Sequence, residues 1–142
     1  MLKGIPNIIS PELLKILMEM GHGDEIVLAD GNFPGASHAQ RLARCDGHGA
    51  PELLDAILSL FPLDSFVPFP VALMDTPPGS DTPPIWVTFN DIICRHEPQS
   101  NKVERIERFA FYERAKSAYA IVATGESAIY ANIILKKGII TK

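Results

Sequence analysis

The sequence contains few cysteines and has no excess of positive charge, and each shortage excludes a class of protein. Only two cysteines, Cys45 and Cys94, occur among 142 residues. They do not form a C-x-x-C pair, so we expect reduced thiols in a cytoplasmic protein. The net charge of -4 offers no basic surface that could follow a phosphate backbone, so nucleic acid is not an expected partner.

Long apolar runs are absent as well. No stretch approaches the roughly 18 consecutive apolar residues that suggest a transmembrane helix. The opening residues, MLKGIPNIISPELL, lack the apolar segment of a secretory signal. We therefore expect no association with a membrane.

Several catalytic and cofactor motifs are missing. No G-x-G-x-x-G follows a strand and no Walker sequence occurs, which argues against a nucleotide cofactor. The segment TGESA differs from the G-x-S-x-G turn of hydrolases. Zinc sites usually show paired His or Cys at short spacing, and no such pair joins His22, Asp24, Asp30 or His48. We expect neither a metal nor another cofactor.

What the sequence does contain is an alternation of helical and extended patterns over one domain, residues 1–142. Ser10, Pro11 and Glu12 resemble a helix start, apolar residues then recur at helical spacing, and Gly21 is expected to end this helix in a left-handed conformation. Further helices are expected at 51–61, 85–95 and 112–117, and strands at 25–29, 41–45, 71–74, 103–109, 119–124 and 131–135. The proline-rich residues 75–84 are expected to form a loop. This order predicts an α/β fold, with a sheet covered by helices on both faces.

Polar residues flank the first predicted strand. His22 lies between two glycines before it, and Asp30 follows it. Ligands bind at strand ends in α/β sheets, and an imidazole both gives and takes protons near neutral pH. His22 is therefore either an acid–base group or a cap on the preceding helix, and Asp30 is either a ligand-binding carboxylate or part of a turn.

Two other segments carry candidate binding residues. Tyr130 and Asn132 are two positions apart, and on a strand they would point to the same side and could hold hydroxyl groups. Residues 107–115 mix charged and aromatic side chains, which is also typical of an amphipathic element. Residues 46–49, DGHG, are expected to form a turn.

Five segments in order resemble the RbsD/FucU family of sugar mutarotases over nearly the whole chain. They are LKGIP-x-IISPELL, MGHGDEIVLAD-x-NFP, FPLDSFV, ERFAFYERA and ATGESAIYANIILKKG. The block RFAFYERAKSAYAIVATGE is similar to the branch that acts on L-fucose. The D-ribose pyranase branch shares the GHGDEI and YAN segments.

The resemblance implies a three-layer α/β/α sandwich of the RbsD-like type, and exchange of the α and β anomers of L-fucose through the open aldehyde. It implies that His22 is the catalytic acid. It also implies a ring-shaped homo-oligomer, a decamer, whose sites are completed between neighbouring subunits. The residues implied to contact the sugar are Asp30, Arg108, Tyr130 and Asn132, with Tyr112 and Asp64 as further candidates.

Three alternatives remain open at this stage. A D-ribose pyranase would use the same ring-opening chemistry on another sugar. A non-catalytic monosaccharide-binding protein would bind fucose without changing the rate of anomer exchange. A metalloenzyme would contain stoichiometric metal.

Overall fold

The computed structural model describes residues 1–142 and is built on one six-stranded sheet, in the order β2-β5-β1-β6-β3-β4. The register pairs show that β1 to β5 run parallel to one another and that only β6 is antiparallel. The strands are β1 (Glu25–Ala29), β2 (Leu42–Cys45), β3 (Val71–Met74), β4 (Val103–Ile106), β5 (Ala120–Thr124) and β6 (Ile133–Lys136).

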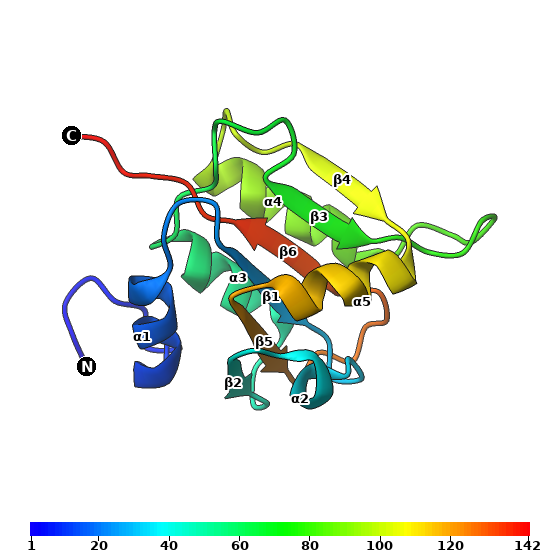
Figure 1. Ribbon diagram of the computed structural model, residues 1–142, viewed down its shortest axis with the longest axis horizontal. Coiled ribbons are helices and arrows are strands. Elements are labelled where there is room, and N and C mark those ends of the chain that lie inside the picture. Colours follow the sequence, from blue (N-terminus) through cyan, green and yellow to red (C-terminus); the bar gives the residue numbers. More distant parts are fainter.

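Helices cover both faces of this sheet, so the expected three-layer α/β/α sandwich is confirmed (Figure 1). On one face lie α1 (Pro11–Glu19), α3 (Ala50–Leu58) and α4 (Ile85–His96). On the other lie α2 (Gly35–His38) and α5 (Arg108–Ser117). No helix has both the length and the apolar character needed to cross a bilayer.

The central strand β1 shows why helices must cover both faces of the sheet. Ile26 and Leu28 belong to the larger apolar cluster beneath α1, α3 and α4, whereas Val27 and Ala29 belong to the smaller cluster beneath α5. Successive side chains of a strand point to opposite faces, and an apolar run without alternation therefore needs two cores. Full burial of each large aliphatic side chain stabilises the fold by about 1.5–3 kcal/mol.

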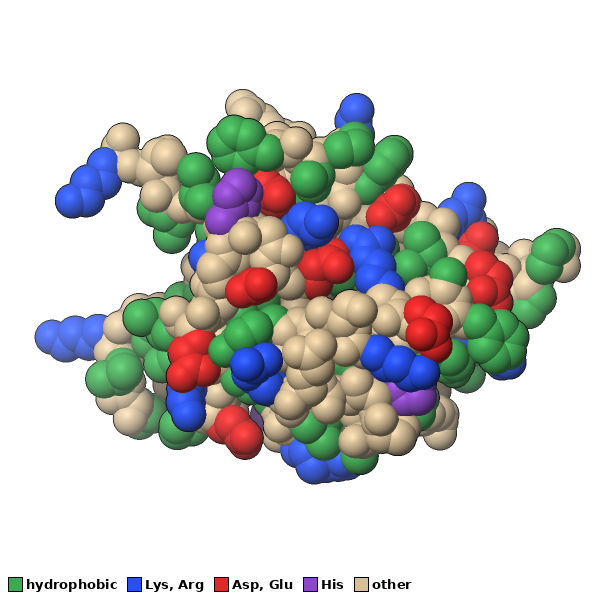
Figure 2. All heavy atoms as spheres, viewed as in Figure 1, with side chains coloured by type: hydrophobic (Ala, Val, Ile, Leu, Met, Phe, Trp, Pro, Cys, Tyr) green, Lys and Arg blue, Asp and Glu red, His purple; other side chains and the backbone are tan.

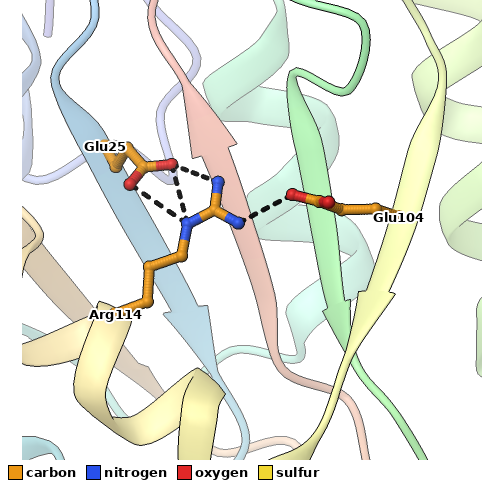
Figure 3. A network of polar contacts seen from close by, with 3 residues as sticks. All are labelled: Glu25, Glu104 and Arg114. Atoms are coloured by element: carbon orange, nitrogen blue, oxygen red, sulfur yellow. Dashed lines mark hydrogen bonds and ion pairs between the residues drawn. The ribbon is translucent and has the colours of Figure 1, made fainter.

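An ion-pair network holds α5 against the sheet. This helix buries only Phe111 and Ala115. Arg114 reaches over the sheet from α5, and its guanidinium contacts Glu25 at the start of β1 and Glu104 on β4 (Figure 3). These two carboxylates raise the pKa of Arg114 above its ordinary value. Around the network, acidic and basic side chains are interspersed on the face that carries α5 (Figure 2).

Three local expectations were wrong. The left-handed glycine after α1 is Gly23, with φ 86°, and not Gly21. The extended segment expected at 103–109 ends at Ile106, because the Glu107 side chain accepts hydrogen bonds from the first amides of α5. Tyr130 does not lie on a strand: its φ is 57° and β6 begins three residues later. The short helix α2 was not anticipated.

Because β1 to β5 run parallel, their carboxyl ends lie along one side of the sheet and their amino ends along the opposite side. We call the edge where β1 to β5 end and β6 begins the carboxyl edge, and the opposite one the amino edge. Asp30 follows β1 and Asn132 precedes β6, so both lie at the carboxyl edge. His22 precedes β1 and therefore lies at the amino edge.

Candidate functional site

His22 lies in a turn at the amino edge, fixed by backbone and side-chain contacts. The neighbouring Gly23 amide donates to the carbonyl of Lys137 just beyond β6, and Asp24 accepts a hydrogen bond from the Gly21 amide. Asp24 thus has a structural role in this turn. The side chain of His22 is 45% exposed, and the ring of Phe66 lies 5.4 Å from the imidazole, centroid to centroid. The imidazole is therefore accessible on one side.

Asp64 contacts the buried side of the imidazole. Its Oδ1 lies 3.1 Å from Nε2 of His22 and also accepts a hydrogen bond from the Phe66 amide. Burial alone would raise the pKa of Asp64, but the hydrogen bonds from Phe66 and His22 outweigh it and lower that pKa. An ionised carboxylate can only accept, so Nε2 carries the proton and Nδ1 is left to exchange one. Asp64 is only 3% exposed and lies behind His22.

At the carboxyl edge, Asp30 and Asn132 form a reciprocal pair. The Asp30 amide donates to Oδ1 of Asn132 at 2.8 Å, and Nδ2 of Asn132 donates to Oδ2 of Asp30 at 2.9 Å. The Asn32 amide donates to the other carboxylate oxygen. Asp30 and Asn132 are 7% and 3% exposed. Asp30 is thus held rigidly, and the amide of Asn132 is occupied in holding it.

Arg108 and Tyr130 line a common cavity of about 530 Å³ at the same edge. Arg108 is the first residue of α5, and its guanidinium lies 4.6 Å from the centre of the Phe109 ring. The remaining lining residues are Asp75, Thr76, Pro77, Pro78, Glu107 and Phe109. The cavity therefore combines carboxylates, a guanidinium and a phenol with apolar surface.

Tyr112, one turn further along α5, is placed differently. Its ring packs edge-on against Phe33 at 5.4 Å and His38 at 5.5 Å, centroid to centroid, and also meets Phe109. Tyr112 does not line the cavity that contains Arg108 and Tyr130. Its aromatic neighbours join α5 to α2 beside Asp30.

Sequence reasoning missed Asp75 and Glu107. Asp75 follows β3 directly, and its amide donates to the Ile106 carbonyl at the end of β4. The rule that ligands bind beyond the carboxyl ends of strands could have identified it. Glu107 caps α5, and its hydrogen bonds from the Phe109 and Ala110 amides lower its pKa. Both residues line the cavity that contains Arg108.

The two groups of candidate residues lie at opposite edges of the sheet. The five residues of β1 separate His22 from Asp30, and a strand of that length spans about 16 Å. The structure therefore brings together His22 and Asp64, Asp30 and Asn132, and Arg108 and Tyr130. Asp30 lines a separate hollow of about 290 Å³. The residues of the amino edge and those of the carboxyl edge do not meet within one chain. No three His, Cys, Asp or Glu side chains cluster in a way that could hold a metal ion. His48 lies in the expected turn, 3.4 Å from Glu52.

Comparison with known sequences places these residues in a family context. Residues 3–140 match the model of the RbsD / FucU transport protein family. The fucose mutarotase of Homo sapiens is 50% identical over 147 residues, which cover 98% of this chain and 94% of the human protein.

Solved structures show the same similarity. The crystal structure of the fucose mutarotase from Streptococcus pneumoniae in complex with L-fucose superposes with a TM-score of 0.95 at 57% identity, covering 99% of this chain and 100% of that one. Bacillus subtilis RbsD, complexed with D-ribose, shares the fold with a TM-score of 0.76 at 21% identity, covering 99% of this chain and 100% of that one.

Proposed function

Because the chain belongs to the RbsD/FucU family, we propose that it is an L-fucose mutarotase, an isomerase that interconverts the α and β anomers of L-fucopyranose. The observation that carries this proposal is the cavity at the carboxyl edge, considered together with full-length relatives named for that activity. Its charged and phenolic groups suit sugar hydroxyls. Phe109, Pro77 and Pro78 offer apolar surface for the methyl group of a 6-deoxy sugar.

Anomer exchange requires only proton transfers and rotation about one carbon–carbon bond. The ring oxygen takes a proton as its bond to C1 breaks, and the C1 hydroxyl loses a proton as it becomes the aldehyde. The C1 carbonyl then turns over, and the same transfers run in reverse when the ring closes. General acid–base catalysis of such steps contributes about 10²–10⁴-fold.

In our proposal His22 is the catalytic acid and base. Asp64 holds the proton on Nε2 and stabilises the positive imidazolium, so Nδ1 delivers the proton to the ring oxygen and later recovers it. The Tyr130 phenol relays the proton of the C1 hydroxyl to solvent water, accepting that proton as it donates its own to the water, and the transfer reverses when the ring closes. These steps involve no redox change and no covalent intermediate with the enzyme.

The remaining residues bind the sugar or support those that do. Asp30 accepts hydrogen bonds from sugar hydroxyls through lone pairs that Asn32 and Asn132 leave free. Arg108 donates to sugar oxygens from the cavity wall. Asn132 contributes by fixing the Asp30 carboxylate, and Tyr112 by supporting α5 through its aromatic neighbours.

A second copy of the chain completes the site in this proposal. One monosaccharide cannot bridge the length of β1, so His22 of one copy has to approach the carboxyl edge of another. The surfaces that meet are then different on the two copies, and repeated head-to-tail contacts of this kind form a ring when the rotation between copies closes. The family resemblance leads us to propose a decamer.

His22→Ala tests this function. Saturation-transfer NMR measures exchange between the α and β anomers, and we expect the variant to reduce the enzyme-dependent rate of L-fucose exchange to that of buffer. His48→Ala, which alters a turn histidine whose side chain is 43% exposed, close to the 45% of His22, is the matched control and should exchange L-fucose at the native rate. Exchange at the native rate in His22→Ala would show that the assignment of His22 is wrong.

The same assay separates the other candidate functions. Faster exchange of D-ribose than of L-fucose would identify a pyranase. Binding of L-fucose without any acceleration of exchange would identify a non-catalytic binding protein.

A further inference from the structure

Tyr130 has an unusual backbone conformation. It is the sole non-glycine residue with a positive φ, at 57°. L-amino acids with a Cβ avoid this left-handed region, whereas glycine adopts it freely. Residues held in such conformations cluster at functional sites when the surroundings enforce them. The phenol of Tyr130 is therefore kept at this position although glycine would suit the backbone better.

One buried side chain holds this backbone. Nε1 of Trp86, on α4, donates a hydrogen bond of 2.9 Å to the carbonyl oxygen of Tyr130 across 44 positions of sequence. Trp86 is 7% exposed. An indole has a single donor and no acceptor, so this bond uses all of its hydrogen-bonding capacity.

The carbonyl that Trp86 holds belongs to a residue that lines two cavities, as Thr76 also does. Tyr130 lines both the 530 Å³ cavity that contains Arg108 and a neighbouring cavity of about 840 Å³ beside the proline-rich loop. The direction of the Cα–Cβ bond follows from the backbone, so a change in the Tyr130 backbone would also move the phenol. Trp86, which holds that backbone through the carbonyl, is thus placed to fix where the phenol lies.

We propose that Trp86 is a positioning residue for the mutarotase reaction, which orients the Tyr130 phenol through the Tyr130 carbonyl. The proposal rests on the proposed function, because it assumes that the phenol acts on the sugar. This role differs from general packing, because removal of the indole N–H should affect catalysis only when the Tyr130 phenol is present.

A double-mutant cycle tests this dependence. Trp86→Phe keeps an aromatic ring and removes the N–H, and loss of one neutral hydrogen bond should lower kcat for L-fucose exchange about fivefold. In the Tyr130→Phe background the same substitution should change kcat by less than a factor of about two. Equal losses in both backgrounds would overturn the proposal, as would native kcat in Trp86→Phe.

Ile93→Val is the matched control. Ile93 is fully buried on the same helix, so its truncation disturbs packing and leaves the hydrogen bond from Trp86 to Tyr130 in place. It should leave kcat within about twofold of native. A loss of kcat as large as that of Trp86→Phe would overturn the proposal, because packing alone would then explain the effect.

A measurement on the native protein covers the case in which Trp86→Phe does not fold. Trp86 is the single tryptophan, so the protein has one indole N–H resonance. We expect this proton to be protected from exchange with solvent and its resonance to shift when L-fucose saturates the protein. Rapid solvent exchange or an unchanged resonance would overturn the proposal. Failure of the mutarotase function is distinct, because the native protein would then leave the anomer exchange rate unchanged.

Discussion

Asp64 holds the imidazole of His22, with Oδ1 of the carboxylate 3.1 Å from Nε2 of the ring. The side chain of Asp64 is 4% exposed and that of His22 is 45% exposed. The carboxylate is thus a fixed internal partner, and the imidazole is the part that a ligand can reach. Asp64 contacts His22 from the protein interior and fixes the tautomer of its imidazole, as expected for a histidine that acts as an acid and base.

Asp64→Asn should lower L-fucose exchange about tenfold or more, because a hydrogen bond to an ionised carboxylate is replaced by one to a neutral amide. The amide also no longer requires the proton to be on Nε2. Saturation-transfer NMR gives the rate. Asp91→Asn changes an exposed acid on α4 and should exchange at the native rate. A rate for Asp64→Asn within about twofold of native would contradict the role assigned to Asp64.

Arg114→Met should destabilise the fold by about 2 kcal/mol, because it leaves two partly buried carboxylates without their partner. The side chains of Glu25 and Glu104 are 17% and 34% exposed, so this cost is smaller than for a fully buried pair. Unfolding in urea measures it. Lys116→Met removes an exposed pair with Glu113 from the same helix and should change stability by less than about 1 kcal/mol. Equal effects of the two substitutions would mean that the network does not fasten α5.

Asp55 should make stability depend on pH. Its hydrogen bond with His96, assisted by Arg95, lowers the pKa of this carboxyl. The ionised Asp55 carboxylate therefore stabilises the folded protein above the ordinary pKa of about 3.9. This stabilisation is lost as the pH falls through the lowered pKa of the folded protein. Because half of the Asp55 side chain is exposed, Asp55→Asn should cost no more than about 1 kcal/mol at pH 7. In urea unfolding at pH 2 the difference should be much smaller, and an equal difference at both pH values would contradict this account.

The strands could be predicted closely because their signal is local. The apolar segments at 25–29 and 71–74 are strands with the expected bounds, since short apolar runs between turns suit a sheet that is buried on both faces. Gly21 was wrongly expected to be left-handed because two glycines flank His22, and composition alone does not say which one turns the chain.

The backbone of Tyr130 could not be predicted from local pattern. Residues 131–135 were expected to form a strand with Tyr130 next to it, yet the contact that holds Tyr130 comes from Trp86, 44 positions away. The helix expected at 112–117 in fact begins at Arg108. Its start was missed because an acid such as Glu107 caps a helix less often than it lies within one.

For the site, the sequence predicted that His22 precedes β1 and that Asp30 follows it. It therefore also predicted that the two residues lie at opposite ends of this strand. What the sequence did not show is that Asn132 is occupied in holding Asp30 and that Asp75 lines the same cavity as Glu107 and Arg108. These are contacts between distant segments, which appear only when strand order and direction are known.

Mixed oligomers test most directly whether two copies share one site. We expect His22→Ala and Arg108→Ala each to abolish or greatly reduce L-fucose exchange when purified alone. If a site takes His22 from one copy and Arg108 from its neighbour, co-expression in equal amounts restores about a quarter of the sites, since each intact half is supplied in half of the cases. Exchange at about a quarter of the native rate is the predicted result. Exchange no faster than that of the single variants, in oligomers shown to contain both chains, would contradict the account.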